Sequence, residues 1–262
     1  MPATVPLFHR DFGNSGPPLV ILHGMLGSSR NWQLAAKDLA ERGFHVLVPD
    51  LRNHGQSPHA SEMDYESMGA DVLAWMDRLE LGPLHLMGHS MGGKIAMLLA
   101  CRHPDRVERL TVVDIAPKAY RWVGHRLEFA AMEAIDLEHL ASRAEAELKM
   151  EGRVPDWAMR KFLTKNLERA EPGPGWRWTI NLPVISAALG QLESNPLRPE
   201  DRYVGPTRFI AGGKSNYVNP ALDLPVIKQY FPSANLIVIP TSGHNPHFDT
   251  RPEFVAAVIQ DI

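Results

Sequence analysis

Gly88-His89-Ser90-Met91-Gly92 is the stretch of sequence that decides the fold. It stands between an apolar run, Leu84–Met87, and a segment with a helical pattern over residues 92–100. Gly-x-Ser-x-Gly between a strand and a helix is typical of a nucleophile elbow, a turn so tight that its serine takes strained backbone angles. The flanking glycines let the strand and the helix approach each other without a side-chain clash. We therefore predict that Ser90 is a catalytic nucleophile; the plainer alternative is a serine that caps an ordinary helix.

Apolar runs alternate with helical patterns on both sides of this turn. This alternation is typical of a parallel sheet with helices on both faces, and the sequence therefore predicts an α/β fold. The predicted strands are residues 19–22, 44–48, 84–87, 110–113, 207–211 and 236–239. The predicted helices that flank them are residues 32–42, 68–79, the elbow helix and a last helix that begins near Pro252. Each strand is followed by a loop rich in Gly, Pro, Asp or Ser, where the ligand-facing residues of such sheets collect.

The alternation stops between Pro117 and about Tyr203. This part has helical patterns over residues 126–135, 137–150, 157–168 and 184–192. A helical block inserted into an alternating chain is interpreted as a cap over the ligand end of the sheet. We therefore predict an α/β core of residues 1–117 and 204–262, and a helical cap of residues 118–203.

Composition narrows the possible partners and compartments. The 262 residues carry a formal net charge of -3 and contain no basic cluster, which argues against a nucleic-acid partner. The lone cysteine, Cys101, excludes an internal disulfide and fits a reducing compartment. No secretory leader is visible in residues 1–13, and no stretch is long enough for stable insertion into a membrane. We expect a cytoplasmic protein that is a monomer or a homodimer.

A serine hydroxyl needs a general base within hydrogen-bond reach. Among the 12 histidines, His244 lies in a loop after the last predicted strand, and it fits the order Ser, acid, His that this architecture uses. We assign the base to His244. His247 is the nearest rival, although it lies closer to the final helix. His85, inside the strand before the elbow, is interpreted as a buried and hydrogen-bonded ring.

The base needs a carboxylate that orients its ring. In hydrolases of this kind the acid usually follows the strand of residues 207–211, but Ser215 occupies that position and cannot carry the charge. Asp114 follows the preceding strand, one strand nearer the elbow, and can reach the same imidazole. We assign the acid to Asp114 and an auxiliary hydrogen bond to Ser215. The plainer alternatives are a turn carboxylate and an ordinary loop serine.

An oxyanion hole needs two N–H donors. Met91, directly after the nucleophile, supplies the first. The second is expected from the loop His23-Gly24-Met25-Leu26-Gly27-Ser28, where the glycines let the backbone approach closely, and we choose the N–H of Met25. The chemistry belongs to the backbone, so the methionine side chains only shape the pocket wall.

Together these residues resemble the α/β-hydrolase superfamily. The loops at 23–28 and 50–58, the elbow, and Val113-Asp114-Ile115-Ala116-Pro117 are similar to capped esterases of the YbfF type and their abhydrolase-domain relatives. The resemblance implies carboxylester hydrolysis by Ser90, Asp114 and His244, with Ser215 as an auxiliary residue. We interpret residues 50–57 as structural, because Asp50 and Arg52 can tie down that loop. The chain departs from these relatives at Asn245-Pro246, where bulky apolar residues are common.

The sequence therefore predicts a serine esterase that acts on a small-molecule ester or thioester and requires neither a cofactor nor a metal. An acyl-CoA thioesterase, a cofactor-free perhydrolase and a C–C bond hydrolase stay open as alternatives, because one fold hosts many chemistries. A ligand receptor that keeps the pocket without turnover is the alternative outside enzymes.

Overall fold

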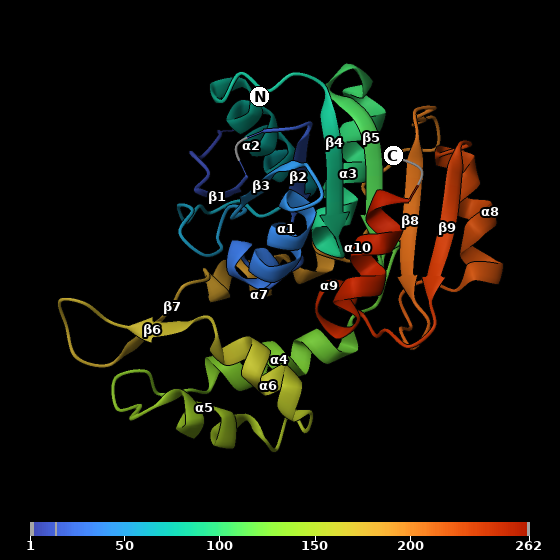
Figure 1. Ribbon diagram of the computed structural model, residues 1–262. Coiled ribbons are helices and arrows are strands. Elements are labelled where there is room, and N and C mark those ends of the chain that lie inside the picture. Colours follow the sequence, from blue (N-terminus) through green and yellow to red (C-terminus); the bar gives the residue numbers. More distant parts are fainter. Residues whose placement is uncertain (1–2, 14, 261–262) are drawn as a thin grey trace.

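A seven-stranded sheet forms the centre of the computed structural model, which describes residues 3–13 and 15–260 (Figure 1). Its strand order is β1-β3-β2-β4-β5-β8-β9, and every neighbouring pair is parallel except β1 with β3. The strands are β1 (His9–Phe12), β2 (Pro18–Leu22), β3 (His45–Pro49), β4 (Leu84–His89), β5 (Val107–Val113), β8 (Thr207–Gly212) and β9 (Ala234–Ile239). The predicted α/β fold is confirmed. The outer ends of the predicted core, residues 1–2 and 261–262, lie outside the described residues.

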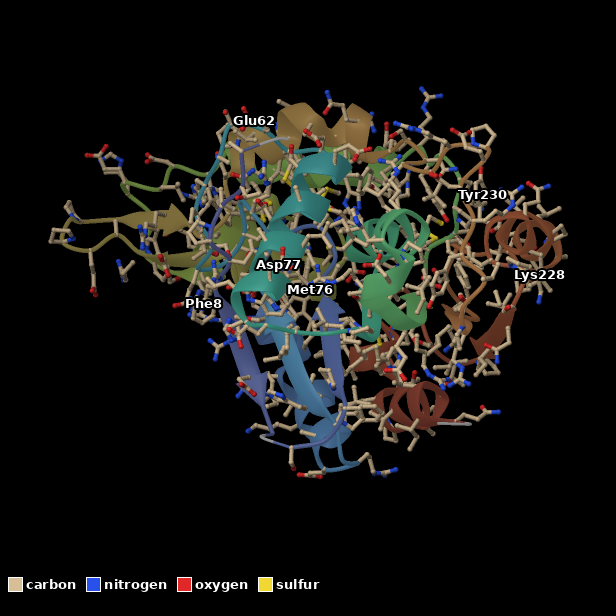
Figure 2. All side chains as sticks on the ribbon, turned by 90° about the horizontal axis from the view of Figure 1, so that it is seen from above. Phe8, Glu62, Met76, Asp77, Lys228 and Tyr230 are labelled. Atoms are coloured by element: carbon tan, nitrogen blue, oxygen red, sulfur yellow. The ribbon has the colours of Figure 1, made fainter. Side chains whose placement is uncertain are left out.

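Helices cover both faces of this sheet (Figures 1 and 2). On one face lie α1 (Gln33–Ala40) and α10 (Arg251–Ile259), and on the other lie α2 (Tyr65–Arg78), α3 (Met91–Arg102) and α8 (Pro220–Tyr230). Short helical turns, η1 (Ser29–Trp32), η2 (Pro104–Arg106) and α9 (Pro246–Asp249), connect the larger elements. Successive strand residues point to opposite faces, so Leu19 and Ile21 join one apolar cluster whereas Val20 and Leu22 join the other. Because both faces are buried there, the inner strands β2 and β3 read as largely apolar runs.

Residues 118–203, called the cap segment below, lie across the carboxyl ends of the strands (Figure 1). The segment contains α4 (Val123–Glu133), α5 (Arg143–Met150), α6 (Trp157–Thr164), β6 (Leu167–Arg169), β7 (Trp176–Trp178) and α7 (Leu182–Leu192). Parts of it form a common apolar core with the sheet, since Trp122 and Phe129 belong to the same buried cluster as Leu86. Trp157, by contrast, is 62% exposed.

Two helix predictions in the cap segment were wrong in part. The helix predicted over residues 157–168 ends at Thr164, and Leu167–Arg169 pairs with Trp176–Trp178 as an antiparallel hairpin. The helix predicted over 137–150 begins only at Arg143, because the Ser142 hydroxyl accepts a hydrogen bond from the N–H of Glu145 at 3.1 Å. The Glu145 carboxylate in turn accepts from the N–H of Ala141. The Ser142 cap starts the helix, and the Glu145 carboxylate holds the residue before the cap.

Buried polar contacts hold the cap segment against the sheet. Lys94 of α3 is fully buried, and its ammonium donates to the carbonyls of Leu192 at 3.5 Å, Glu193 at 3.3 Å and Ser194, all at the end of α7. Burial lowers the pKa of Lys94 to about 7. Tyr65 of α2 donates to the same Leu192 carbonyl at 2.6 Å. The Lys94 hydrogen bonds join α3, the helix that follows the elbow, directly to residues 192–194 of the cap segment.

In the described ranges, no helix combines the length and the apolar character that crossing a membrane would require.

Candidate active site

Ser90 occupies a sharp turn between β4 and α3. Its backbone angles are φ 52° and ψ -119°, a conformation that residues other than glycine rarely adopt. A Cβ atom at Gly88 would lie 2.2 Å from the carbonyl oxygen of Gly92, and one at Gly92 would lie 2.3 Å from that of Leu22. Only glycine fits at these positions. The strained turn predicted from the sequence is confirmed.

Asp114 and His244 are hydrogen-bonded to each other. Asp114 follows β5, is fully buried, and places Oδ2 2.7 Å from Nδ1 of His244. Its Oδ1 accepts the N–H of Gly212 at 2.9 Å, and the hydroxyl of Ser215 donates to Oδ2. With the carboxylate as acceptor, Nδ1 of His244 carries the proton. The other ring nitrogen, Nε2, is then free to act as a base.

Neighbouring rings hold His244 beside the elbow. His89, adjacent to Ser90, donates from Nε2 to the carbonyl oxygen of His244 at 2.8 Å. Burial holds the pKa of His89 well below its usual range, so the ring is neutral and the proton lies on the nitrogen facing that carbonyl. The ring of Tyr217 stacks on His244 with centroids 3.7 Å apart. Within the described chain, no hydrogen bond joins the Ser90 hydroxyl to His244; such bonds often tighten only when substrate binds.

The loop after β2 lies against the elbow. A Cβ atom at Gly24 would lie 3.2 Å from Cβ of Ser90, which places the next residue, Met25, close to the serine. Across residues 3–13 and 15–260, the backbone N–H groups of Met25 and Met91 donate no hydrogen bond. Two uncommitted N–H donors therefore flank Ser90. A negatively charged oxygen is the group that such a pair stabilises.

Two buried histidines fix the conformation of that loop. Nε2 of His54 accepts the N–H of Leu26 at 3.3 Å, and Nε2 of His23 accepts the N–H of Leu51 at 2.9 Å. Each ring directs Nδ1 to a backbone carbonyl, Arg52 for His54 and Gly24 for His23. Burial lowers the pKa of His54 to about 3, so it accepts as a neutral ring. Protonation of either ring would remove its acceptor.

The two other histidines considered from the sequence, His247 and His85, make packing and hydrogen-bond contacts with residues other than the catalytic groups. His247 stacks on Trp32 with ring centroids 3.9 Å apart, and burial lowers its pKa to about 3. His85 is buried and bonded to the hydroxyl of Thr111 at 2.8 Å, as the sequence indicates.

The loop after β3 is tied down by its charged side chains. Asp50 accepts the N–H groups of Ser29 and Gln56, at 2.6 and 2.9 Å. Arg52 forms two bonds with Asp71, at 2.6 and 2.9 Å. These contacts agree with the structural role that the sequence indicates for Asp50 and Arg52.

Sequence reasoning missed the positioning contacts made by His89, Tyr217 and Lys94. A signal exists for two of them. His89 stands next to the nucleophile, and Tyr217 lies two residues after Ser215 in the loop that follows β8. Lys94 gave no such signal, because its carbonyl partners are about a hundred residues away in the chain.

Comparison with known proteins gives consistent matches over most of the chain. Residues 17–250 match the protein family described as alpha/beta hydrolase fold. A mouse protein named sn-1-specific diacylglycerol lipase ABHD11 is 40% identical over 248 residues, which cover 92% of this chain and 80% of that protein. Esterase YbfF of Escherichia coli is 31% identical over 247 residues, 94% of this chain and 93% of the enzyme. The solved structure of a marine microorganism esterase superposes with a TM-score of 0.95 at 37% identity, covering 99% of this chain and all of that one.

Proposed function

Because this chain belongs to the α/β-hydrolase fold family and is a carboxylic ester hydrolase, we propose that it cleaves small to medium acyl esters through an acyl-enzyme intermediate on Ser90. The Asp114–His244 hydrogen bond of 2.7 Å carries this proposal. A fully buried carboxylate that holds an imidazole beside a strained serine is the arrangement that activates a hydroxyl nucleophile.

The first half of the reaction acylates Ser90. Nε2 of His244 takes the hydroxyl proton as the serine oxygen attacks the ester carbonyl, and Asp114 stabilises the imidazolium that forms. The oxygen of the tetrahedral intermediate accepts hydrogen bonds from the N–H groups of Met25 and Met91. His244 then gives the proton to the departing alkoxide, which leaves as the alcohol.

The second half releases the acid. A water molecule loses a proton to Nε2 of His244 and attacks the acyl carbonyl, and the same two N–H groups hold the oxyanion. Collapse of this intermediate returns the proton to the serine oxygen and frees the carboxylic acid. Ser215 acts through Asp114, so we class it as a positioning residue.

We extend the proposal to domain organisation and assembly. Residues 118–203 act as a cap that limits access to Ser90, and residues 3–117 and 204–260 supply the catalytic groups. The protein works in the cytoplasm as a monomer or homodimer on a small-molecule ester. Light scattering during size-exclusion chromatography tests the assembly.

The test of the activity combines a substrate series with a serine-directed inactivator. Purified protein is assayed with p-nitrophenyl esters of two to ten acyl carbons and with the matching acyl-CoA thioesters. A fluorophosphonate probe should label wild type and abolish turnover, whereas Ser90→Ala should show neither labelling nor turnover. A burst of p-nitrophenol equal to the enzyme concentration supports the acyl-enzyme. Hydrolysis that persists in Ser90→Ala would overturn the assignment, and a preference for the acyl-CoA series would redirect it to thioesterase activity.

A further inference from the structure

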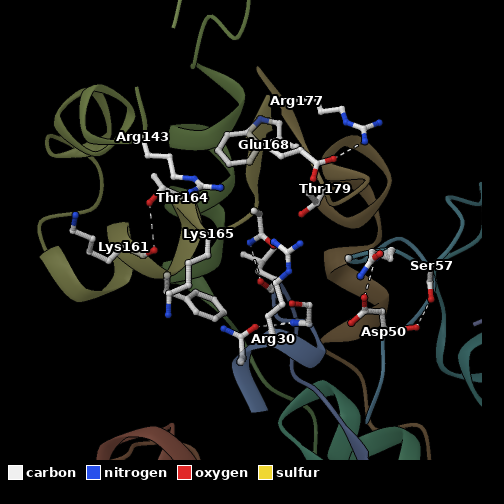
Figure 3. Close-up of a pocket in the computed structure, with 18 of the residues that line it drawn as sticks. Arg30, Asp50, Ser57, Arg143, Lys161, Thr164, Lys165, Glu168, Arg177 and Thr179 are labelled. Atoms are coloured by element: carbon white, nitrogen blue, oxygen red, sulfur yellow. Dashed lines mark hydrogen bonds and ion pairs between the residues drawn. The ribbon is translucent and has the colours of Figure 1, made fainter. Parts of the chain in front are cut away.

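A cavity of about 960 Å³ lies between the cap segment and the loops of the core, outside the set of catalytic groups. In Figure 3, Arg30, Asp50 and Ser57 line it from the core loops, and Lys165 and Glu168 belong to the cap-segment side. Its walls carry more positive than negative side chains. The cations are Arg30, Arg143, Lys161, Lys165 and Arg177, and the carboxylates are Asp50, Glu147 and Glu168.

All three carboxylates have partners within the protein. Asp50 accepts two backbone N–H groups. Glu147 pairs with Lys161 at 2.9 Å, and Glu168 pairs with Arg177 at 2.6 Å. Lys161 and Arg177 are therefore already paired with carboxylates of the cavity wall.

The other three cations have no acidic partner among the described residues. For the chain as described, the guanidinium of Arg30 forms neither a hydrogen bond nor an ion pair, and the ammonium of Lys165 has only a contact with the Phe248 ring at 5.5 Å. A third cation, Arg143, donates to the Leu167 carbonyl at 3.1 Å. The chain as a whole carries a net charge of -3, so the excess of positive charge in this cavity is local. Such an excess attracts anions.

The cavity lies next to the loop after β2, which carries Met25. Leu26, which lines it, directly follows Met25, whose N–H we propose as an oxyanion donor. Asn166 of the cap segment, another lining residue, donates from Nδ2 to the Leu26 carbonyl at 2.9 Å. The cavity therefore adjoins the loop that carries one of the proposed oxyanion donors, at the boundary between the cap segment and the core.

We infer that this cavity binds an anionic group, a phosphate or a carboxylate, carried by the ester substrate. Arg30 on the core side and Lys165 on the cap-segment side supply the charges that recognise it. The guanidinium offers paired N–H donors that suit both oxyanions, and the ammonium adds a point charge. The inference rests on the proposed esterase function and narrows its substrate class to anionic esters.

Matched substrate pairs test this inference. For an anion on the acyl side, p-nitrophenyl butyrate is compared with the mono-p-nitrophenyl ester of glutaric acid. For an anion on the alcohol side, monobutyrin is compared with butyryl glycerol 3-phosphate. Arg30→Gln and Lys165→Gln should each lower the ratio of kcat/KM for the anionic over the neutral ester about tenfold in at least one pair, the effect of one lost charged contact. The pair that responds identifies the side that carries the anion.

Lys149→Gln is the control, because Lys149 carries the same charge on the cap segment but pairs with Glu145 at 2.7 Å and does not line the cavity. It should leave both ratios at the wild-type values. Calorimetry adds a readout without turnover: inorganic phosphate should bind Ser90→Ala more tightly than the Ser90→Ala, Arg30→Gln double variant.

Unchanged ratios in both pairs, together with equal phosphate binding by the two proteins, would overturn the anion site. Neutral-ester hydrolysis that depends on Ser90 would still stand in that case. Hydrolysis that survives in Ser90→Ala would instead count against the proposed function.

Discussion

The ring of Tyr217 lies almost parallel to the ring of His244, with centroids 3.7 Å apart and planes 16° from each other. The hydroxyl of Tyr217 is 3.5 Å from Nε2 of His125, whose Nδ1 is 2.5 Å from a carboxylate oxygen of Glu128. Both of these partners belong to α4 of the cap segment. The proposed base is thus oriented at its edge by Asp114 and over its face by a tyrosine that also touches the cap segment.

Loss of the Tyr217 ring should slow catalysis. Tyr217→Leu removes the stacked face and should lower kcat roughly 2- to 10-fold, which corresponds to one aromatic pair. Tyr217→Phe keeps the ring and removes only the long contact with His125, so its kcat should stay within about twofold of wild type. Steady-state assays with a p-nitrophenyl ester measure both. Equal losses in the two variants would show that the hydroxyl, not the stack, matters.

Asp114→Asn should abolish most activity without unfolding the protein. The amide cannot stabilise the imidazolium and favours the wrong ring tautomer, so kcat should fall by roughly 10³- to 10⁴-fold. Asparagine tolerates the left-handed backbone at this position, where φ is 49°, and the melting temperature should change little. Circular dichroism and single-turnover kinetics check the two parts. A variant that keeps a tenth of the wild-type rate would place the acid elsewhere.

Ser215→Ala should cost far less than Asp114→Asn. The hydroxyl is one of several groups bonded to the Asp114 carboxylate, which keeps its contacts with Gly212 and His244 in the variant. We expect kcat to drop roughly tenfold, the effect of one hydrogen bond to a charged group. The comparison is made with the same ester and the same burst assay. A loss equal to that of Asp114→Asn would make Ser215 indispensable rather than auxiliary.

The sequence was most informative where backbone chemistry restricts residue choice. The Gly-x-Ser-x-Gly turn located the elbow, and the polar residues after buried strands located Asp114 and His244, which the structure brings within hydrogen-bond distance. These features could be predicted because strand ends of a parallel sheet meet at one edge.

Other features depended on contacts that the local sequence does not encode. β1, with the sequence His9-Arg10-Asp11-Phe12, is an edge strand whose polar residues show no apolar run. α8 was not predicted, because Pro225 interrupts its helical pattern. The sequence also does not show that Arg30 of the core and Lys165 of the cap segment line the same cavity, because that depends on how the two parts pack. Partner choice over long distances is a property of the folded chain.

Gly88→Ala should destabilise the fold itself. The added methyl group would lie 2.2 Å from the Gly92 carbonyl oxygen, and backbone on both sides of the elbow would have to move. We expect the free energy of unfolding to fall by about 3 kcal/mol or more, at the upper end for overpacking. Gly152→Ala is the matched control, since no atom lies within 4 Å of its added carbon. Urea titration measures both, and a Gly88→Ala protein as stable as the control would contradict the tight approach.

Acid should destabilise the protein through its buried neutral histidines, and His85 is the clearest case. Burial, with the charges of Arg109 and Arg208, lowers its pKa from 6.5 to about 3 in the folded state. Between these two pH values the unfolded chain binds a proton that the folded ring does not. Folding free energy is therefore lost as the pH falls, at up to about 1.4 kcal/mol per pH unit for this one group.

The variant that isolates this contribution is His85→Leu, which cannot titrate. Urea unfolding at pH 6.5, 5.5 and 4.5 should give a shallower dependence of stability on pH in His85→Leu than in wild type, by about one proton per molecule. Met87→Leu serves as the control, because it alters packing on the same strand without removing a titratable group, and its slope should remain close to that of wild type. The slope, and not the stability at one pH, decides the outcome, since the substitution also alters packing beside Thr111. Identical slopes in wild type and His85→Leu would mean that the buried ring accepts its proton in the folded state.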